Sequence, residues 1–230
     1  MKKPLVKKIL SETEVGYDLI SEKFSQTRNR FWGELESIKD YVKDGDNVLD
    51  YGCGNGRLLE LFLDKEIEYI GADISGNLIE FARRKYENRE FVKLDPSQEI
   101  LPFSDEYFNS VYSIAVFHHI PSGEFRLKLA RELFRSVKSG GRIVVTAWNL
   151  WQPRYKKEIY KNWFRKMIGK SDLDWNDCYI SFTDNEGKKF NRFHHAFTVG
   201  DLRNLFSKAG FKIEKCEVVD GRNVVLIGKK

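Results

Sequence analysis

Cysteine and long apolar runs are scarce in this 230-residue chain. Its three cysteines, Cys53, Cys178 and Cys216, are odd in number and form no C-x-x-C pair. We therefore expect neither a disulfide framework nor a structural zinc site, and we predict no metal. No apolar run approaches the roughly 20 residues of a membrane helix, and the N-terminal apolar segment is too short for a signal peptide. The simplest expectation is a reduced, cytoplasmic protein that does not cross a membrane.

Two common nucleotide-binding signatures are missing from the glycine-rich stretch Gly52 to Gly56. The dinucleotide fingerprint is G-x-G-x-x-G, but this stretch reads G-x-G-x-G and is followed by Arg57. No Gly-Lys-Ser/Thr follows these glycines, so the stretch is not a P-loop. A different nucleotide-type ligand is indicated.

The stretch nevertheless lies in the context of a binding element. Val48 and Leu49 indicate the end of a buried strand, and helical apolar spacing begins after Arg57. Glycines there allow a sharp turn and a close approach of ligand to backbone. Asp73 ends a second strand about 20 residues on, where ribose hydroxyls would bind. Asp50 would repel a pyrophosphate and favour an ammonium-bearing ligand such as S-adenosylmethionine.

A third strand ends at Asp95, from which a side chain can meet an adenine amino group. The residues that we predict to bind the cofactor are Asp50, Gly52, Gly54, Gly56, Asp73, Ile74, Asp95 and Ala115.

Strands and helices alternate along most of the chain. We predict strands ending at residue 49 and over residues 68–72, 90–94, 109–116, 142–146, 211–218 and 223–228, with helices over 76–86, 122–138 and 199–209. The hairpin signal Asp220-Gly221 makes the last strand antiparallel. The fold class is therefore α/β: a Rossmann-like, doubly wound seven-stranded sheet, mostly parallel with an antiparallel last strand and helices on both faces.

The chain is expected to form a single domain, 1–230, with two additions to the sheet. Residues 14–43 form an N-terminal helical cap, with a short helix over 17–24 and a second over 31–42. Residues 149–196 form a substrate-recognition insertion in which no strand is predicted. Because it follows the fifth strand, this insertion should lie at the ligand-binding edge of the sheet.

The basic charge is concentrated within that insertion. Between Trp151 and Lys170 there are seven basic residues and one acid, so the segment carries 7 − 1 = +6 of a total of +5. Five aromatic residues are interleaved with these charges: Trp151, Tyr155, Tyr160, Trp163 and Phe164. Such a patch suits a phosphate backbone with unstacked bases. A solvated helix with an aromatic inner face explains it equally well.

The order of these motifs resembles that of the class I S-adenosylmethionine-dependent methyltransferases. VLDYGCGNG resembles the first motif of that superfamily and Asp73 its ribose-binding acid. Asp95 with Leu101-Pro102-Phe103 resembles its adenine region, while SIAVFHHI and VKSGGRIVV resemble its fourth- and fifth-strand motifs. The resemblance spans residues 48–146 and implies S-adenosyl-L-methionine as cofactor.

Outside that core, the chain resembles the tRNA wobble-uridine carboxymethyl methyltransferases, the AlkB-homologue methyltransferase-domain type. An N-terminal segment matches through Tyr17, Asp18, Ile20, Phe24, Ser25, Thr27, Arg28 and Trp32. A second segment matches through Arg192, Phe193, His195 and Phe197, and Trp148 and Gln152 match residues after strand five. The resemblance implies tRNA modification at the anticodon region, and related eukaryotic enzymes use a small activator subunit.

The implied reaction converts a carboxymethyl group on uridine into its methyl ester. A carboxylic acid with an ordinary pKa near 4 is ionised at neutral pH, so no general base is required. A cation must hold the carboxylate, preferably as a bidentate guanidinium. Arg28 and Arg192 are the predicted catalytic cations, with His195 as a hydrogen-bond donor.

Several alternatives remain open at this point. Adjacent residues on a strand face opposite ways, so neither His118 with His119 nor His194 with His195 is expected to bind a metal jointly. A second hypothesis is that the chain shares only the cofactor core and methylates a small carboxylate or metabolite. A non-catalytic binding protein on the same fold is the third hypothesis.

Overall fold

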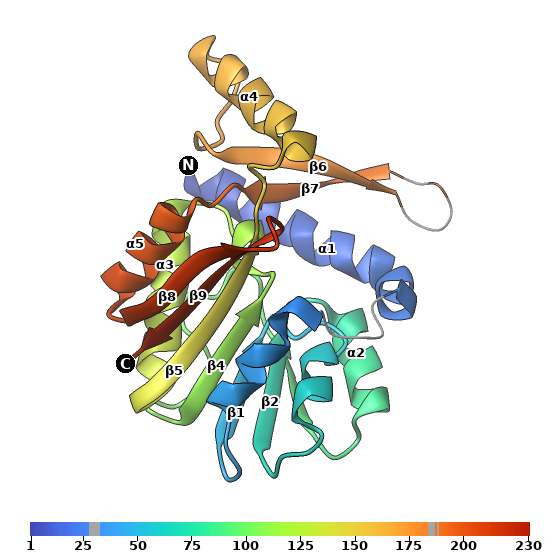
Figure 1. The fold of residues 1–230 in the computed structure, drawn as a ribbon. Coiled ribbons are helices and arrows are strands. Elements are labelled where there is room, and N and C mark those ends of the chain that lie inside the picture. The colour runs from blue at the N-terminus through green and yellow to red at the C-terminus, as the bar shows by residue number, and fades with distance from the viewer. Residues whose placement is uncertain (28–32, 184–186, 188) are drawn as a thin grey trace.

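A computed structural model of the chain describes residues 1–27, 33–183, 187 and 189–230. Its centre is a seven-stranded sheet in the order β3-β2-β1-β4-β5-β9-β8 (Figure 1). The parallel strands are β1 (Asn47–Tyr51), β2 (Glu68–Asp73), β3 (Glu90–Lys93), β4 (Phe108–Ile114) and β5 (Val137–Trp148). β9 (Asn223–Lys229) runs antiparallel to β5, and β8 (Lys212–Val219) runs antiparallel to β9. The predicted fold class is confirmed.

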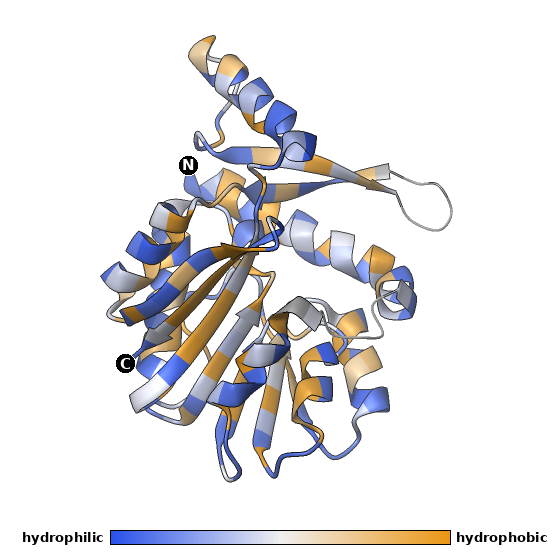
Figure 2. Ribbon diagram, in the orientation of Figure 1, coloured by the Kyte–Doolittle hydropathy of each residue, from blue (hydrophilic) through white to orange (hydrophobic). Residues whose placement is uncertain are grey.

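Successive strand residues point to opposite faces of the sheet, and each face has its own hydrophobic core. On one face, Leu49 and Val111 pack beneath α3 (Gly123–Ser136) and α5 (Val199–Ala209). On the other, the neighbouring residues Val48 and Tyr112 pack beneath three shorter elements: η1 (Gly33–Tyr41), η2 (Arg57–Phe62) and α2 (Gly76–Lys85). Figure 2 shows apolar residues gathered in the strands and on the helix faces turned towards them. Each fully buried large side chain contributes about 1.5–3 kcal/mol.

The N-terminal cap is longer than predicted. Its first helix, α1, spans Lys3–Thr27 rather than 17–24, because apolar residues such as Ile9 and Leu10 continue the buried stripe that includes Ile20. The second predicted helix is the 3₁₀ helix η1. Within the described residues, no helix combines the length and apolar character needed to cross a membrane.

The boundary between α3 and β5 also differs from the prediction. The helix ends at Ser136, and the chain enters β5 at Val137, which pairs with Phe108. Gly140 and Gly141 therefore lie inside the strand instead of ending the helix. A Cβ on Gly141 would lie 2.7 Å from the Asn109 carbonyl oxygen, so close packing of the strands explains this glycine.

The prediction that the insertion contains no strand is wrong. After α4 (Pro153–Met167), β6 (Asp177–Thr183) and β7 (Lys189–His195) form an antiparallel hairpin of their own. Figure 1 shows α4 stacked on this hairpin, beyond the ligand-binding edge of the main sheet. Both strands mix polar and aromatic residues without strict alternation, so their sequence carried little strand signal.

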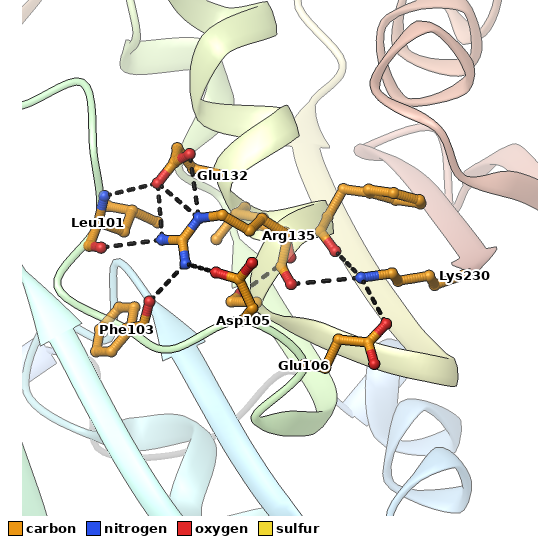
Figure 3. Close-up of polar contacts among 10 residues, drawn as sticks. Leu101, Phe103, Asp105, Glu106, Glu132, Arg135 and Lys230 are labelled. Carbon is orange, nitrogen blue, oxygen red and sulfur yellow. Dashed lines mark hydrogen bonds and ion pairs between the residues drawn. The ribbon is translucent and has the colours of Figure 1, made fainter.

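A polar network holds the loop between β3 and β4 (Figure 3). The Arg135 guanidinium donates to the carbonyl oxygens of Leu101 and Phe103 at 3.1 and 2.7 Å, and it contacts Asp105 and Glu132 at 2.6 and 2.8 Å. The hydrogen bond to Glu132 raises the pKa of Arg135. The network therefore ties this loop to α3.

α1 is fastened to the start of α2 by one side chain. The Asp18 carboxylate accepts hydrogen bonds from Ser75 Oγ at 2.6 Å and from the Asn77 amide at 3.2 Å. A carboxylate at a helix N-terminus also interacts favourably with the helix dipole. Asp18 therefore joins the cap to the sheet.

Replacing Asp18 with alanine should loosen α1 without unfolding the sheet. Loss of these charge-assisted hydrogen bonds should lower the local stability of α1 by about 1.5–3 kcal/mol. Hydrogen–deuterium exchange should become faster in α1 and stay unchanged in β1, β4 and β5. Glu22→Ala, an exposed change on the same helix, is the control. Unchanged α1 exchange in Asp18→Ala would contradict this assignment.

Candidate functional site

The glycine-rich turn after β1 is shaped by backbone geometry. Gly52, Gly54 and Gly56 have φ angles of 81, 56 and 76°. A Cβ on Gly52 would lie 2.2 Å from Val116 Cγ2, so only glycine fits there. The turn forms one wall of a cavity that Asp50, Gly52, Gly54, Asp73, Ile74 and Ala115 line.

Two predicted cofactor residues lie outside that lining. Gly56 is the N-cap residue of η2, and a Cβ there would lie 3.0 Å from the Tyr86 ring, so this glycine allows close packing. The exposed Asp95 carboxylate accepts hydrogen bonds from the Ser97 amide and hydroxyl, both at 2.7 Å. Its neighbours Leu94 and Pro96 line the cavity instead. For all eight residues, contact with the cofactor stays a prediction.

Asp73 joins the end of β2 to the glycine turn. Its Oδ2 accepts a hydrogen bond from the Gly54 amide and its Oδ1 one from the Ser75 amide, both at 2.8 Å. Burial raises the pKa of Asp73, and these backbone bonds oppose the rise. Each carboxylate oxygen keeps a further lone pair, which suits a ribose hydroxyl.

Asp50 is a buried carboxyl at the end of β1, with 2% of its surface exposed. Burial raises its pKa to about 7, although the Tyr69 hydroxyl donates a hydrogen bond to it at 2.8 Å and lowers the value. A cation in the cavity would favour the ionised form. Asp50 therefore fits a ligand that carries an ammonium or sulfonium group.

Ala115 lies in the cavity wall with a strained backbone. Its φ of 60° is in the left-handed region, which costs about 1–3 kcal/mol for a residue with a side chain. Its amide donates to the Thr146 carbonyl oxygen at 3.0 Å and to the Thr146 hydroxyl at 2.9 Å. These bonds hold the end of β4 in the bent form that opens the cavity.

α1 closes the cavity opposite the glycine turn, through Leu10, Thr13, Tyr17 and Phe24. The Tyr17 hydroxyl lies 2.7 Å from His119 Nε2. His119 Nδ1 lies 3.0 Å from the Phe193 carbonyl oxygen, which only accepts, so Nδ1 carries the proton and Nε2 accepts from Tyr17. Neither Tyr17 nor His119 was among the predicted site residues, although both lie in motifs identified in the sequence.

Three imidazoles converge beside the cavity, contrary to the argument from strand geometry. His118 and His119 lie in the 3₁₀ turn η3 (Phe117–His119), not on a strand, and their ring centres are 4.2 Å apart. His194 of β7 joins them, and the ligand-capable atoms of all three lie within 4.8 Å of one another. The tertiary structure thus creates a cluster that adjacent sequence positions did not predict.

Two histidines of this cluster, His119 and His194, favour their neutral forms. Burial lowers the pKa of His194 to about 3 and that of His119 well below its usual range. The positive charge of Arg192 lowers both pKa values further. Since the same charge also repels metal cations, the cluster suits an anion better, and the absence of a metal stays a prediction.

Arg192 is buried among aromatic rings, with 8% of its surface exposed. Its guanidinium carbon lies 4.7, 5.6 and 6.0 Å from the ring centres of Phe182, Trp148 and Tyr17. Within the described parts of the chain, no carboxylate pairs with Arg192, and its Nε has no hydrogen-bond partner. Tyr17 also lines the cavity, so Arg192 lies one ring away from it.

The structure describes only one of the other two predicted catalytic residues, His195. His195 is directed away from Arg192: neighbouring strand residues alternate faces, and its Nδ1 contacts the buried Asp177 carboxylate at 2.7 Å. His194, not His195, shares a face with Arg192. Arg28 lies outside the described residues.

The cavity residues fit S-adenosylmethionine on three counts. The left-handed glycine turn lets a ligand approach the backbone, Asp73 presents free lone pairs to a hydroxyl pair, and Asp50 presents a carboxyl to a cation. Among the described residues that line this cavity there is no lysine, and Arg57 is present. These residues would hold the ribose and the cationic end of the cofactor.

Comparisons with known proteins identify the type of domain. A family model described as "Methyltransferase domain" matches residues 49–145. A putative methyltransferase of Encephalitozoon cuniculi is 31% identical over 198 residues, covering 86% of this chain and 85% of that protein. The tRNA (carboxymethyluridine(34)-5-O)-methyltransferase of Arabidopsis thaliana is 36% identical over 132 residues, covering 57% of this chain. The aligned regions span only 22 to 31% of the length of this and two similarly named relatives.

Solved structures with the same fold include two methyltransferases. An S-adenosylmethionine-dependent methyltransferase of Methanosarcina mazei gives a TM-score of 0.69 at 23% identity, covering 87% of this chain and 98% of that one. A putative methyltransferase of Haloferax volcanii, solved with the Trm112 methyltransferase activator, gives 0.66 at 16% identity, with coverages of 94 and 96%. At these identities the likeness shows the fold alone.

Binding of S-adenosylmethionine should release a proton below pH 7 because the cationic cofactor favours ionised Asp50. In the free protein, a raised carboxyl pKa means that the folded state holds its proton more tightly, so stability should fall as pH rises from about 4 to about 7. Cofactor affinity should rise with pH up to the Asp50 pKa, by up to about tenfold per pH unit.

Calorimetry in two buffers of different ionisation enthalpy measures this proton release. Asp50→Asn should abolish it and flatten the pH dependence, whereas Asp64→Asn, an exposed change, should not. An unaltered pH slope in Asp50→Asn would refute the role of Asp50.

The motif order, the sheet topology and a relative aligned over most of both chains point the same way. They identify the cofactor together with the fold. The chain belongs to the class I S-adenosylmethionine-dependent methyltransferases, and its cofactor is S-adenosylmethionine.

Proposed function

We propose that this methyltransferase esterifies a carboxylate, and that the carboxylate is the carboxymethyl group of a modified wobble uridine in tRNA. The observation that carries the first part is Arg192. A buried, unpaired cation costs several kcal/mol, which the site recovers only when an anion binds. A carboxylate acceptor supplies that anion beside the cofactor cavity.

The chemistry needs little from the protein beyond positioning. When bound, S-adenosylmethionine supplies an electrophilic methyl group: a C–O bond to the acceptor forms as the C–S bond breaks, and the electron pair stays on sulfur. An ionised carboxylate has no proton to lose, which agrees with a cluster of neutral histidines that are poor bases. Orientation of the two partners is worth about 7–11 kcal/mol.

Within this proposal, Arg192 holds the acceptor and Tyr17 sets the distance to the cofactor. The hydrogen bond of Tyr17 to His119 fixes the ring that separates Arg192 from the cavity. Arg28 is proposed as a second cation on the strength of its motif, since it follows directly after α1 in the sequence. His195 acts through Asp177 to hold the hairpin, not as a donor to the acceptor.

The tRNA substrate rests on the resemblance of two segments and on the relatives' names. Tyr17 and Asp18 of the N-terminal motif face the cavity and α2, and Arg192 of the second motif lies behind Tyr17. The two motifs thus come together around the Tyr17 ring. The relatives named as tRNA (carboxymethyluridine(34)-5-O)-methyltransferases favour this acceptor over a small carboxylate.

An activator subunit is proposed on narrower grounds. The Haloferax volcanii protein of the same fold was solved with the Trm112 activator. Co-expression of such a small activator with this chain should yield a stable complex with higher methyl transfer than the chain alone. Equal activity with and without it would set this partner aside.

Replacing Arg192 with glutamine should remove the anchor for the carboxylate. We expect kcat/KM to fall at least about 100-fold, which corresponds to the roughly 3 kcal/mol of a charge-assisted hydrogen-bond pair. Cofactor binding, followed by thermal shift, should be unchanged. Arg192→Lys should retain part of the activity, and Arg84→Gln on the exposed face of α2 is the control. Full activity of Arg192→Gln would contradict the anchor.

The acceptor itself is identified with radiolabelled cofactor and tRNA from a strain lacking the gene. Base-labile label should appear in the wobble nucleoside, since methyl esters hydrolyse in alkali. Mass spectrometry of the nucleosides locates the added methyl group. Transfer to a small metabolite, with none to tRNA, would overturn the tRNA substrate and leave the methyltransferase assignment intact.

A further inference from the structure

A second, larger cavity lies on the side of the hairpin that faces α4. It is a groove of about 1150 Å³ with walls from α1 and α4 and a floor from β6 and β7. Pockets for small ligands are usually about 300–1,000 Å³, so this groove exceeds the space that one metabolite needs. Its size suits a segment of a polymer.

Basic side chains dominate the rim of the groove. Three acids line it, Glu12, Glu158 and Asp172, against six basic residues: Lys8, Arg154, Lys157, Lys161, Arg165 and Lys170. The groove therefore carries 6 − 3 = +3, although the chain outside residues 151–170 sums to about −1. A recessed positive groove attracts an anionic chain, and a flat membrane surface cannot reach its floor.

The aromatic residues of α4 separate into two groups. Trp151, Tyr155 and Trp163 pack inward with Leu150 and Ile159. Tyr160 and Phe164 are 49 and 60% exposed, and they lie one turn apart on the helix. Trp175, 52% exposed, lies beyond the same helix. These three exposed rings do not line the groove, whereas Tyr155 and Tyr179, both half-buried, do. Rings beside basic side chains match the stacking platforms of single-stranded nucleic acid sites.

On β7 the groove lining stops one residue before Arg192, which itself lines neither cavity. β7 contributes Phe190 and Asn191 to the floor, and Arg192 follows directly along the same strand. Strand residues advance about 3.3 Å each, so the floor ends about that distance along the strand from Arg192. α1 separates the two cavities and lines both, through Tyr17 on one side and Gly16 on the other.

We propose that this groove holds a single-stranded RNA segment, with phosphates on its basic side chains and unpaired bases stacked on Tyr155 and Tyr179. The inference rests on the proposed function, because it places the RNA chain whose modified base reaches Arg192. It assigns substrate recognition to α4 and β6 and leaves methyl transfer to the main sheet.

Fluorescence anisotropy with a labelled anticodon stem-loop RNA tests the groove, with a blunt RNA duplex of equal length for comparison. Six cations predict a slope of about −4 in log K against log salt. Lys157→Glu with Lys161→Glu should weaken binding at least about tenfold and reduce the slope by about 1.4. Tyr155→Ala with Tyr179→Ala should weaken binding at least about fivefold and leave the slope unchanged.

The matched control reverses two charges on the opposite side of the molecule, Lys208→Glu with Lys212→Glu, and should bind RNA as the original chain does. Thermal shift with S-adenosylmethionine verifies that every variant is folded. Unchanged RNA affinity in both groove variants would overturn the proposal. Equal loss in the control, or preference for the duplex or for an acidic peptide, would also overturn it.

Methylation of the free carboxymethyluridine nucleoside separates this proposal from the proposed function. The groove variants should methylate the nucleoside normally and lose kcat/KM only on tRNA. Groove-dependent RNA binding without ester formation would uphold the groove and refute the reaction. Ester formation on tRNA that is unaffected by Lys157→Glu with Lys161→Glu would uphold the reaction and refute the groove.

Discussion

The bond between the Gly54 amide and the Asp73 carboxylate is the interaction on which the site depends. It ties the turn after β1 to the end of β2, and the Gly52 amide adds a second tie to the Ala72 carbonyl oxygen at 2.6 Å. The Ser75 amide donates a hydrogen bond to the other oxygen of Asp73, and the Ser75 hydroxyl donates one to Asp18 of α1. The Asp73 carboxylate thus positions both the glycine turn in the cavity wall and, through Ser75 and Asp18, the helix α1 that closes the cavity.

Two ionisable side chains, Asp50 and Arg192, are buried in or beside the cavity. Asp50 and Arg192 are both removed from water, but Asp50 is satisfied by Tyr69, whereas the Arg192 Nε has no partner within the described chain. A protein tolerates such a cost where a ligand later compensates it. Burial lowers the pKa values of His119 and His194, and the nearby Arg192 charge lowers both further.

α1 connects the two halves of the molecule. One side of the helix presents Tyr17 to the cofactor cavity, and the other presents Gly16 and Glu12 to the basic groove. A Cβ on Gly16 would lie 3.0 Å from the Phe190 ring, so the helix and the hairpin are closely packed. A shift of α1 would therefore be felt in both cavities, because packed interiors transmit displacement.

The cofactor site was readable from the sequence because its signals are local: glycines in a turn, and acids at strand ends that a parallel sheet brings to one edge. The acceptor site was readable only in part. Arg192 was marked by its motif, but the choice of His194 over His195 depends on which face of β7 turns inward, and a strand's parity is set by what it packs against. His118 and His119 converge because their segment coils into a 3₁₀ turn where a strand was expected. The sequence determined the sheet, the cofactor and the charge of the insertion. Only the tertiary structure decided that Tyr17, His119 and Phe193 lie together beside Arg192, because these residues are far apart in the chain and only folding brings them into contact.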